Sequence, residues 1–385
     1  MATFYVAKSG NDSNNGASVG TAKLTIGAAE QLVDASVLAG IATNTISIGN
    51  GTYTETITYT GNNCTFTSTS QDRTAVIITQ SNGSTFKLAK GSTGNAFKHL
   101  TIQNTDDDTN DNGIYGAQGG SGDWASYTVE DCILDCQSAA IQYAHACTIK
   151  RTKFLVNSGD NGSNVYGIKA GTGASGEVFN IEACLFVGWD KWAINGSGGN
   201  CIVRNCTLVL EDSSQSTSYL MYWSGTGVEV YNTIFYGGDS AVDYGLRFQS
   251  ANSDNIAKNC IAFGALRIPY TNTGSPTVSS QLEDNSDVAS DGNTIFTAIG
   301  DAGVGDDYTI NTSGLAYQRG LAAELGSDGK DVDGNDYDSS NPNIGAYATV
   351  ASGWSAGSSA GGVAVGSIAS VTGVAKASIS KISGV

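Results

Sequence analysis

The chain has 385 residues, including 50 glycines and 3 prolines, and only 14% of its residues are charged. This composition is typical of an all-β protein with many turns, and the length permits a large buried core. The formal net charge of −17 argues against nucleic acid and anionic membrane surfaces as partners, because both attract basic patches. Membrane insertion is not expected, because no apolar run is long enough to span a bilayer.

Residues 1–60 are predicted to form an N-terminal cap and the first strands. The segment TFYVAKSGNDSNNG (3–16) has the pattern of a strand followed by a turn, and Leu24–Leu38 has the pattern of an amphipathic helix. A helix over the open end of a stack of strands hides edges that would template aggregation. No export signal precedes the strand, so we expect a protein that is made in a host cytoplasm.

Residues 61–265 contain several copies of one eight-residue pattern. The sixth residues of successive full copies, from Leu100 to Cys260, are 32, 20, 32, 22, 27 and 27 positions apart. A repeat of this length indicates a solenoid whose units are stable only when stacked. The copies are NAFKHLTI (95–102), YTVEDCIL (127–134), CTIKRTKF (147–154), FNIEACLF (179–186), CIVRNCTL (201–208), VEVYNTIF (228–235) and NIAKNCIA (255–262), with a weaker one in CTFTSTSQ (64–71).

The periodicity within each copy identifies the kind of solenoid. Apolar residues alternate with polar ones over positions one to four, and the alternation shifts by one residue at position five. A one-residue bend between two short strands explains the shift. Position five is Asn205, Asn232 and Asn259 in three successive copies, and asparagine tolerates left-handed backbone angles. The sequence therefore predicts a single-stranded parallel β-helix with an N-terminal helical cap.

The polar fourth position is predicted to form an ion ladder along the stack: Lys98, Glu130, Lys150, Glu182, Arg204, Tyr231, Lys258. Opposite charges on neighbouring strands stabilise a sheet by roughly 0.2–1 kcal/mol per pair. This role is favoured over a catalytic role for Glu130 or Glu182.

Most of the eight cysteines fall at inward-facing positions of the repeat. Cys132, Cys184, Cys206 and Cys260 occupy the sixth position, whereas Cys147 and Cys201 occupy the first. We expect buried free thiols, which behave as small apolar side chains. Disulfides between adjacent coils are an open alternative.

Two end motifs resemble right-handed β-helix proteins of the pectate-lyase-like superfamily. One is the strand, turn and helix of the cap followed by IGNGTY (48–53), and the other is DVDGNDYDSSNPNIGAYA (331–348). This sequence has Ala348 where the superfamily usually has Glu. The resemblance implies the fold, but the superfamily contains lyases, hydrolases, epimerases, phage tailspikes and adhesins without enzymatic activity.

The C-terminal part is predicted in three pieces. Residues 266–350 hold the last coils and the closing motif, with loop excursions where the repeat is lost, and residues 351–362 form a Gly/Ser linker. Residues 363–385 contain the pattern S-I-x-x-[VI]-[TS]-G-V at 367–374 and again at 378–385. This tail resembles repeats on phage virion proteins, which implies docking or oligomerisation. The alternative is a final strand pair packed on the β-helix.

Aromatic residues next to carboxylates suggest a glycan-binding surface, because a sugar ring offers an apolar face and hydroxyl edges. The alternative is that these rings fill bends or a subunit interface. The candidate binding residues are Trp189, Trp192, Tyr222, Trp223, Tyr236 and Tyr244, and the candidate catalytic carboxylates are Asp190, Asp239 and Asp243.

No cofactor is expected, with calcium as the one alternative. Asp331, Asp333, Asn335 and Asp336 resemble half of a calcium loop, but no bidentate Glu follows at the required spacing. A structural turn is the favoured interpretation.

The leading hypothesis is a bacteriophage virion appendage, a homotrimeric tailspike, fibre or decoration protein. It would bind host-surface polysaccharide and attach to other virion proteins through residues 363–385. Enzymatic activity is left open, with binding favoured. The alternatives are a polysaccharide lyase or glycoside hydrolase, and an extracellular bacterial adhesin.

Overall fold

The computed structural model describes most of the chain in two compact units, Met1–Ala348 and Thr349–Val385. In the described part, no helix has the length and apolar character needed to cross a membrane. The described residues are 1–38, 40–106, 112–116, 125–156, 165–188, 192–210, 218–249, 254–272, 277–279, 295–298, 307–312, 314, 316–348, 359–360 and 363–364.

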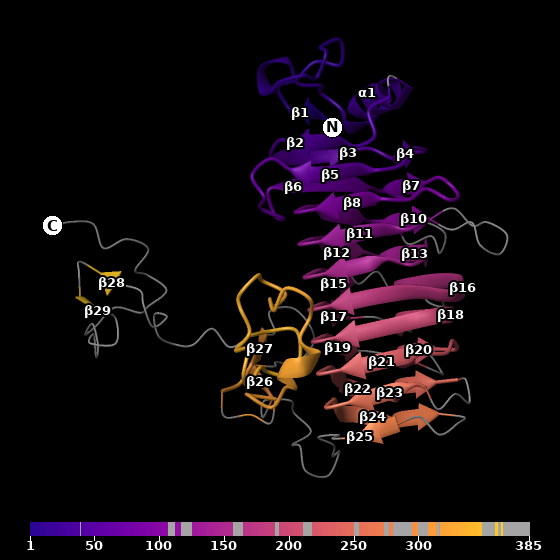
Figure 1. Cartoon of the computed structure of the whole chain (residues 1–385), viewed down its shortest axis with the longest axis vertical. Helices are drawn as coiled ribbons and strands as arrows, with labels where there is room; N and C mark the ends of the chain where they lie inside the picture. Colours follow the sequence, from indigo (N-terminus) through magenta and orange to yellow (C-terminus); the bar gives the residue numbers. More distant parts are fainter. Residues whose placement is uncertain are drawn as a thin grey trace. The chain divides into compact units, whose positions relative to one another are not determined.

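The first unit contains a right-handed parallel β-helix in which the chain passes through three sheets in turn (Figure 1). The first sheet comprises β1 (Ala2–Val6), β2 (Asn44–Ile48), β5 (Cys64–Ser68), β8 (Asn95–Lys98), β11 (Tyr127–Glu130), β14 (Thr148–Lys150), the ends of β16 (Tyr166–Glu182) and β18 (Trp192–Arg204), β21 (Val228–Tyr231), β23 (Ile256–Lys258) and β25 (Thr277–Ser279). The second sheet comprises β3 (Gly51–Thr54), β6 (Val76–Gln80), β9 (Thr101–Asn104), β12 (Ile133–Cys136), β15 (Lys153–Val156), β17 (Leu185–Val187), β19 (Thr207–Leu210) and the starts of β22 (Ile234–Phe248) and β24 (Ile261–Asn272). The third sheet comprises β4 (Ile57–Tyr59), β7 (Phe86–Leu88), β10 (Ile114–Gly116), β13 (Ile141–Ala144), the starts of β16 and β18, β20 (Tyr219–Trp223) and the ends of β22 and β24.

The predicted one-residue bend joins the first sheet to the second. The fifth residue of each full copy has a left-handed backbone, with φ between 46° and 55°. The prediction is confirmed at His99, Asp131, Arg151, Ala183, Asn205, Asn232 and Asn259.

The interior of the coil is apolar, as the alternation requires. Phe66, Phe97, Val129 and Ile149 lie in register on the first sheet and are fully buried. All eight cysteines are buried and free, which confirms the prediction of interior thiols. Burial raises the pKa of the Cys132 thiol to about 12, so it stays protonated near neutral pH.

The ion ladder forms in part. Lys98 Nζ lies 2.6 Å from Glu130, and Lys150 Nζ lies 3.4 Å from Glu182. Glu130 makes its second ion pair with Arg151, which occupies the next bend, and not with Lys150. Although burial alone would raise it, the pKa of Glu130 is held below its usual range by Lys98 and Arg151.

A second apolar core lies outside the second sheet, where the repeat alone predicts solvent. Leu185, Val209, Ile234 and Ile261 point away from the coil interior and are covered by the C-terminal part of the same unit. That part contains β26 (Phe296–Ala298), β27 (Asp307–Ile310) and the 3-10 helix η2 (Ala322–Glu324), with Val332, Ile344 and Ala346 in the core. This cover explains the apolar residues Leu185, Ile234 and Ile261 at position seven of later copies.

The N-terminal cap contains the 3-10 helix η1 (Val19–Thr21) and the helix α1 (Ile26–Leu38), which packs on β1, β2 and β4. The carboxylate of Glu55 accepts hydrogen bonds from the N–H groups of Ile26 and Gly27, both at 3.1 Å. These bonds satisfy free donors at the start of the helix.

The coils continue beyond residue 265, because the end of β24 pairs with β22 and β25 pairs with β23. The expected loop excursions therefore begin later than the sequence suggests. The second unit contains the short pair β28 (Ser359–Ala360) and β29 (Val363–Ala364). The octapeptide copies at 367–374 and 378–385 lie outside the described residues.

Candidate functional site

The outer face of the third sheet carries a row of cationic and aromatic side chains. Parallel pairing aligns successive outward positions from one coil to the next. The partly exposed members are Lys87, Tyr115, Lys169, Asn195, Tyr222 and Arg247. Three of these six side chains, Lys87, Lys169 and Arg247, are cations in a chain with a net charge of −17.

A stack of aromatic rings runs beside that row, at the start of the third-sheet strands. The ring centroids of Tyr166 and Trp192 are 4.9 Å apart, those of Trp192 and Tyr219 are 6.2 Å apart, and those of Tyr219 and Tyr244 are 4.8 Å apart. The interplanar angles are 26°, 19° and 11°, so the rings are nearly parallel. Trp192 and Tyr244 are partly exposed, whereas Tyr166 and Tyr219 are buried.

Two cationic side chains of the protein, Arg247 and Lys169, contact these aromatic rings. The Arg247 guanidinium lies 5.2, 5.6 and 5.5 Å from the ring centres of Tyr219, Tyr222 and Tyr244, and it donates a hydrogen bond to the Tyr219 hydroxyl. Lys169 Nζ lies 4.8 Å from the ring centre of Tyr166. Planar guanidinium groups stack on aromatic faces and also pair with carboxylates. This surface therefore presents aromatic rings and cations side by side.

The structure separates the residues predicted from sequence. Trp192, Tyr222 and Tyr244 share this surface. Trp189 and Asp190 lie outside the described residues, as do the side chains of Asp239 and Asp243 within β22.

Two predicted binding residues require correction, because they are only 2% exposed. Trp223 points into the coil and packs edge-on against Phe179, at 6.1 Å. Tyr236 belongs to the second core and packs against Phe296 at 5.8 Å. Strand alternation accounts for Trp223, since its neighbour Tyr222 takes the outward position.

Sequence reasoning missed Tyr166, Tyr219 and Lys169 as members of the surface. A usable signal existed, because Tyr166, Trp192, Tyr219 and Tyr244 follow one another at intervals of 26, 27 and 25 residues. These intervals match the mean repeat of about 27 residues, as expected for stacked side chains.

The acidic residues near the C-terminus form a structural turn. Asp331 is fully buried, and its carboxylate accepts hydrogen bonds from the backbone N–H groups of Asp333, Asn335 and Ala348 and from the Asn335 side chain. Asp336 pairs with Lys330 at 2.8 Å. The four predicted ligands do not converge, and no cluster of three or more metal-binding side chains occurs among the described residues.

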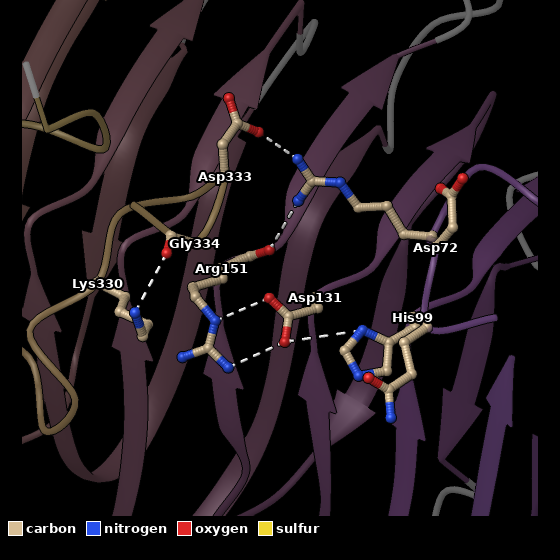
Figure 2. A pocket seen from close by; sticks show the side chains of 9 residues that line it. Asp72, His99, Asp131, Arg151, Lys330, Asp333 and Gly334 are labelled. Carbon is tan, nitrogen blue, oxygen red and sulfur yellow. Dashed lines mark hydrogen bonds and ion pairs between the residues drawn. The ribbon is translucent and has the colours of Figure 1, made fainter. Parts of the chain in front are cut away.

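A polar cavity of about 550 Å³ lies where three of the bends between the first and second sheets meet residues 316–348, here called the C-terminal segment. Figure 2 shows Asp131 between His99 and Arg151. Arg73 forms an ion pair with Asp333. Arg73 also donates to the carbonyl oxygens of Val332 at 2.8 Å and Arg151 at 3.1 Å.

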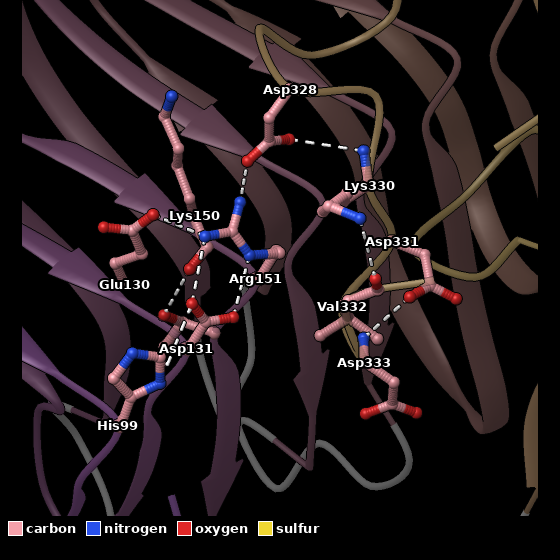
Figure 3. A network of polar contacts seen from close by, with 12 residues as sticks. His99, Glu130, Asp131, Lys150, Arg151, Asp328, Lys330, Asp331, Val332 and Asp333 are labelled. Atoms are coloured by element: carbon pink, nitrogen blue, oxygen red, sulfur yellow. Dashed lines mark hydrogen bonds and ion pairs between the residues drawn. The ribbon is translucent and has the colours of Figure 1, made fainter. Parts of the chain in front are cut away.

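Arg151 is the centre of the network beside this cavity (Figure 3). Its guanidinium donates to both carboxylate oxygens of Asp131, at 2.8 and 3.0 Å, and also pairs with Glu130 and Asp328. The hydrogen bonds to Asp131 raise the pKa of Arg151 above its ordinary value, so the guanidinium stays charged. Arg151 therefore fastens the C-terminal segment to the coils.

Comparison with solved structures adds the following. Pectate lyase Pel9A superposes with a TM-score of 0.52 at 14% sequence identity, over 90% of this chain and 96% of that chain. The match is one of fold. The pectin methylesterase PemA from Erwinia chrysanthemi (15% identity, 74% of this chain, 93% of that chain) and the one from Aspergillus niger (12%, 85% and 97%) have TM-scores of 0.36 and 0.34. Neither a protein-family model nor the sequence of a characterised protein matches the chain.

Proposed function

We propose that this chain binds acidic polysaccharide along the outer face of the third sheet. The observation that supports the proposal is the register of Trp192, Tyr219 and Tyr244, with Arg247 lying against the last two rings. Successive rungs are about 4.8 Å apart, so a glycan along the axis meets one side chain of the row at each rung. The partly exposed rings of Trp192, Tyr222 and Tyr244 contact the sugars, and Arg247 and Lys169 pair with carboxylates of the glycan.

In this proposal the chain is the shaft of a homotrimeric phage appendage. The repeated octapeptide at 367–374 and 378–385 supports attachment to other virion proteins. Deleting residues 363–385 is expected to reduce the mass of the protein oligomer in solution or the incorporation of the protein into virions. An unchanged mass and unchanged incorporation would remove this part of the proposal while leaving glycan binding intact.

The deciding experiment for glycan binding is affinity electrophoresis through gels containing acidic or neutral polysaccharides. The wild-type protein is expected to be retarded by an acidic polysaccharide, and the variants Trp192→Ala, Tyr222→Ala and Arg247→Ala much less. Tyr5→Ala is the matched control, because Tyr5 is partly exposed on the first sheet. Equal retardation of all four variants would contradict the proposal.

A polysaccharide lyase or hydrolase is the second candidate, supported by the same surface and by the superposition with Pel9A. Release of reducing ends, or of unsaturated uronate detected by ultraviolet absorbance, would identify an enzyme. Loss of that activity in Asp190→Asn, Asp239→Asn or Asp243→Asn would then identify the catalytic carboxylates. Binding without either product favours the appendage.

A further inference from the structure

The bend residues beside the polar cavity differ from those elsewhere in the coil. In the last three coils the bends are Asn205, Asn232 and Asn259, whose side-chain amides donate to backbone carbonyls of the C-terminal segment, and the bend before them is Ala183. In the three coils beside the cavity, the same left-handed position holds His99, Asp131 and Arg151. Four consecutive bends therefore lack asparagine, and the three that carry polar or charged side chains all line one cavity.

Asp131 and Arg151 have a structural role there, but the His99 side chain does not fasten the C-terminal segment. Its Nδ1 lies 3.9 Å from Asp131 Oδ2, beyond hydrogen-bond distance, and the side chain is 26% exposed toward the cavity. The left-handed backbone of His99 is the geometry that all seven bends share, so its position is set by the coil and its side chain is left facing the cavity.

The charges that line the cavity decide what kind of ligand it suits. Its cations are Arg73, Arg151 and Lys330, and its carboxylates are Asp72, Asp131 and Asp333, so the lining is neutral overall when His99 is neutral. Both guanidinium groups already pair with carboxylates, which a bound anion would have to displace. The three cations also disfavour a metal ion.

An uncharged ligand with several hydroxyl groups matches this lining. Each hydroxyl both donates and accepts, so it can bond to a carboxylate on one side and to a cation or amide on the other. The volume of about 550 Å³ lies within the usual range for small-molecule sites, about 300–1,000 Å³. We infer that this cavity is a second carbohydrate site, which binds a neutral sugar unit through Gln71, Asp72 and His99.

The site is separate from the third-sheet surface, and its proposed ligand is neutral, whereas the ligand proposed for that surface is acidic. The test is a titration with neutral monosaccharides, with a hexuronate and with inorganic phosphate, followed by NMR of the histidine Hε1 signals. The chain has two histidines, so the variant His99→Asn assigns both signals and restores the asparagine found at later bends. A neutral sugar is expected to shift the His99 signal and leave the His145 signal in place.

The variants Gln71→Ala and Asp72→Ala should each weaken that response about tenfold, and neither residue contacts Arg151 in the ion network. Trp192→Ala, which tests the third-sheet surface, should leave the His99 response unchanged. A response to phosphate or hexuronate only, an unmoved His99 signal, or equal sugar binding by the Gln71→Ala and Asp72→Ala variants and the wild type would overturn the inference. None of these outcomes bears on acidic polysaccharide binding, so the two proposals fail separately.

Discussion

Arg151 and Asp131 occupy the left-handed bends of neighbouring coils, and the guanidinium of one bonds to both carboxylate oxygens of the other. The same guanidinium reaches Asp328 in the C-terminal segment. One side chain thus links two coils to the segment that covers the second sheet. The Arg151 side chain is only 8% exposed, whereas the carboxylates of Glu130, Asp131 and Asp328 are 22%, 23% and 34% exposed and keep part of their contact with water.

Replacing Arg151 by alanine is expected to lower the free energy of unfolding by about 2 kcal/mol, because the partly exposed carboxylates of Glu130, Asp131 and Asp328 lose their shared counter-ion. Urea denaturation followed by circular dichroism measures the change. The control is Lys330→Ala, whose pair with Asp336 is exposed and should contribute less than about 1 kcal/mol. Equal effects of the two substitutions would show that Arg151 does not fasten the segment.

Calcium is expected to leave the stability of the protein unchanged. The buried carboxylate of Asp331 already accepts four hydrogen bonds, so the turn has its oxygen atoms occupied. Thermal unfolding in millimolar calcium and in chelator should therefore give the same midpoint. Asp331→Ala should lower that midpoint under both conditions, because four donors lose their acceptor. A midpoint that rises with calcium in the wild-type protein but not in the Asp331→Ala variant would indicate a calcium site at this turn.

The sequence predicts the coil well because each coil repeats a local pattern. The bend at Asn205 and the buried thiol of Cys206 both follow from alternation within eight residues, and the structure confirms both. The second core could not be predicted in the same way, because Ile234 meets Val332 and Ile344 only after the chain has folded back. Long-range packing of this kind leaves no local period.

The aromatic surface on the third sheet was predictable only in part, for a related reason. Tyr222 and Trp223 are neighbours in sequence, but one points outward and the other into the core. Their aromatic character made both residues candidates for the surface. Only the alternation along the strand shows that Tyr222 faces outward and Trp223 inward. The partners Tyr219 and Arg247 became evident once the register of β20 and β22 was known.

Ala183→Gly is expected to stabilise the protein by about 0.5–1 kcal/mol. Ala183 has φ of 52° at its bend, where a Cβ atom is strained and glycine is not. Glycine also increases the entropy of the unfolded chain, so the net gain is smaller than the strain relieved. Chemical denaturation measures it. The converse control is Asn205→Val, which should destabilise, because a β-branched residue tolerates this backbone poorly.

Stability near the cap should depend on pH through Glu30. Burial, and secondarily Asp34, raise the pKa of Glu30 from its ordinary value of 4.5 to about 7. As the pH rises from 4.5 to 7, the unfolded chain releases this proton before the folded one does, so folding loses stability over that window. Glu30→Gln should therefore raise the unfolding midpoint at pH 8 and have little effect at pH 4. Gln31→Ala, exposed on the same helix, should show no such difference, and a larger gain for Glu30→Gln at pH 4 would contradict the prediction.

Binding of an acidic polysaccharide should weaken as salt is added, because Arg247 and Lys169 contribute charge at a partly exposed surface. Arg247→Ala is expected to reduce affinity about tenfold at low salt and to flatten the salt dependence. Arg247→Lys keeps the charge but loses the planar stacking on Tyr219, Tyr222 and Tyr244, so it should recover the salt dependence more than the affinity. Isothermal titration at several salt concentrations separates the two contributions. If the lysine variant matched the wild type in affinity, charge alone would explain the role of Arg247, and the stacked geometry would have no part in binding.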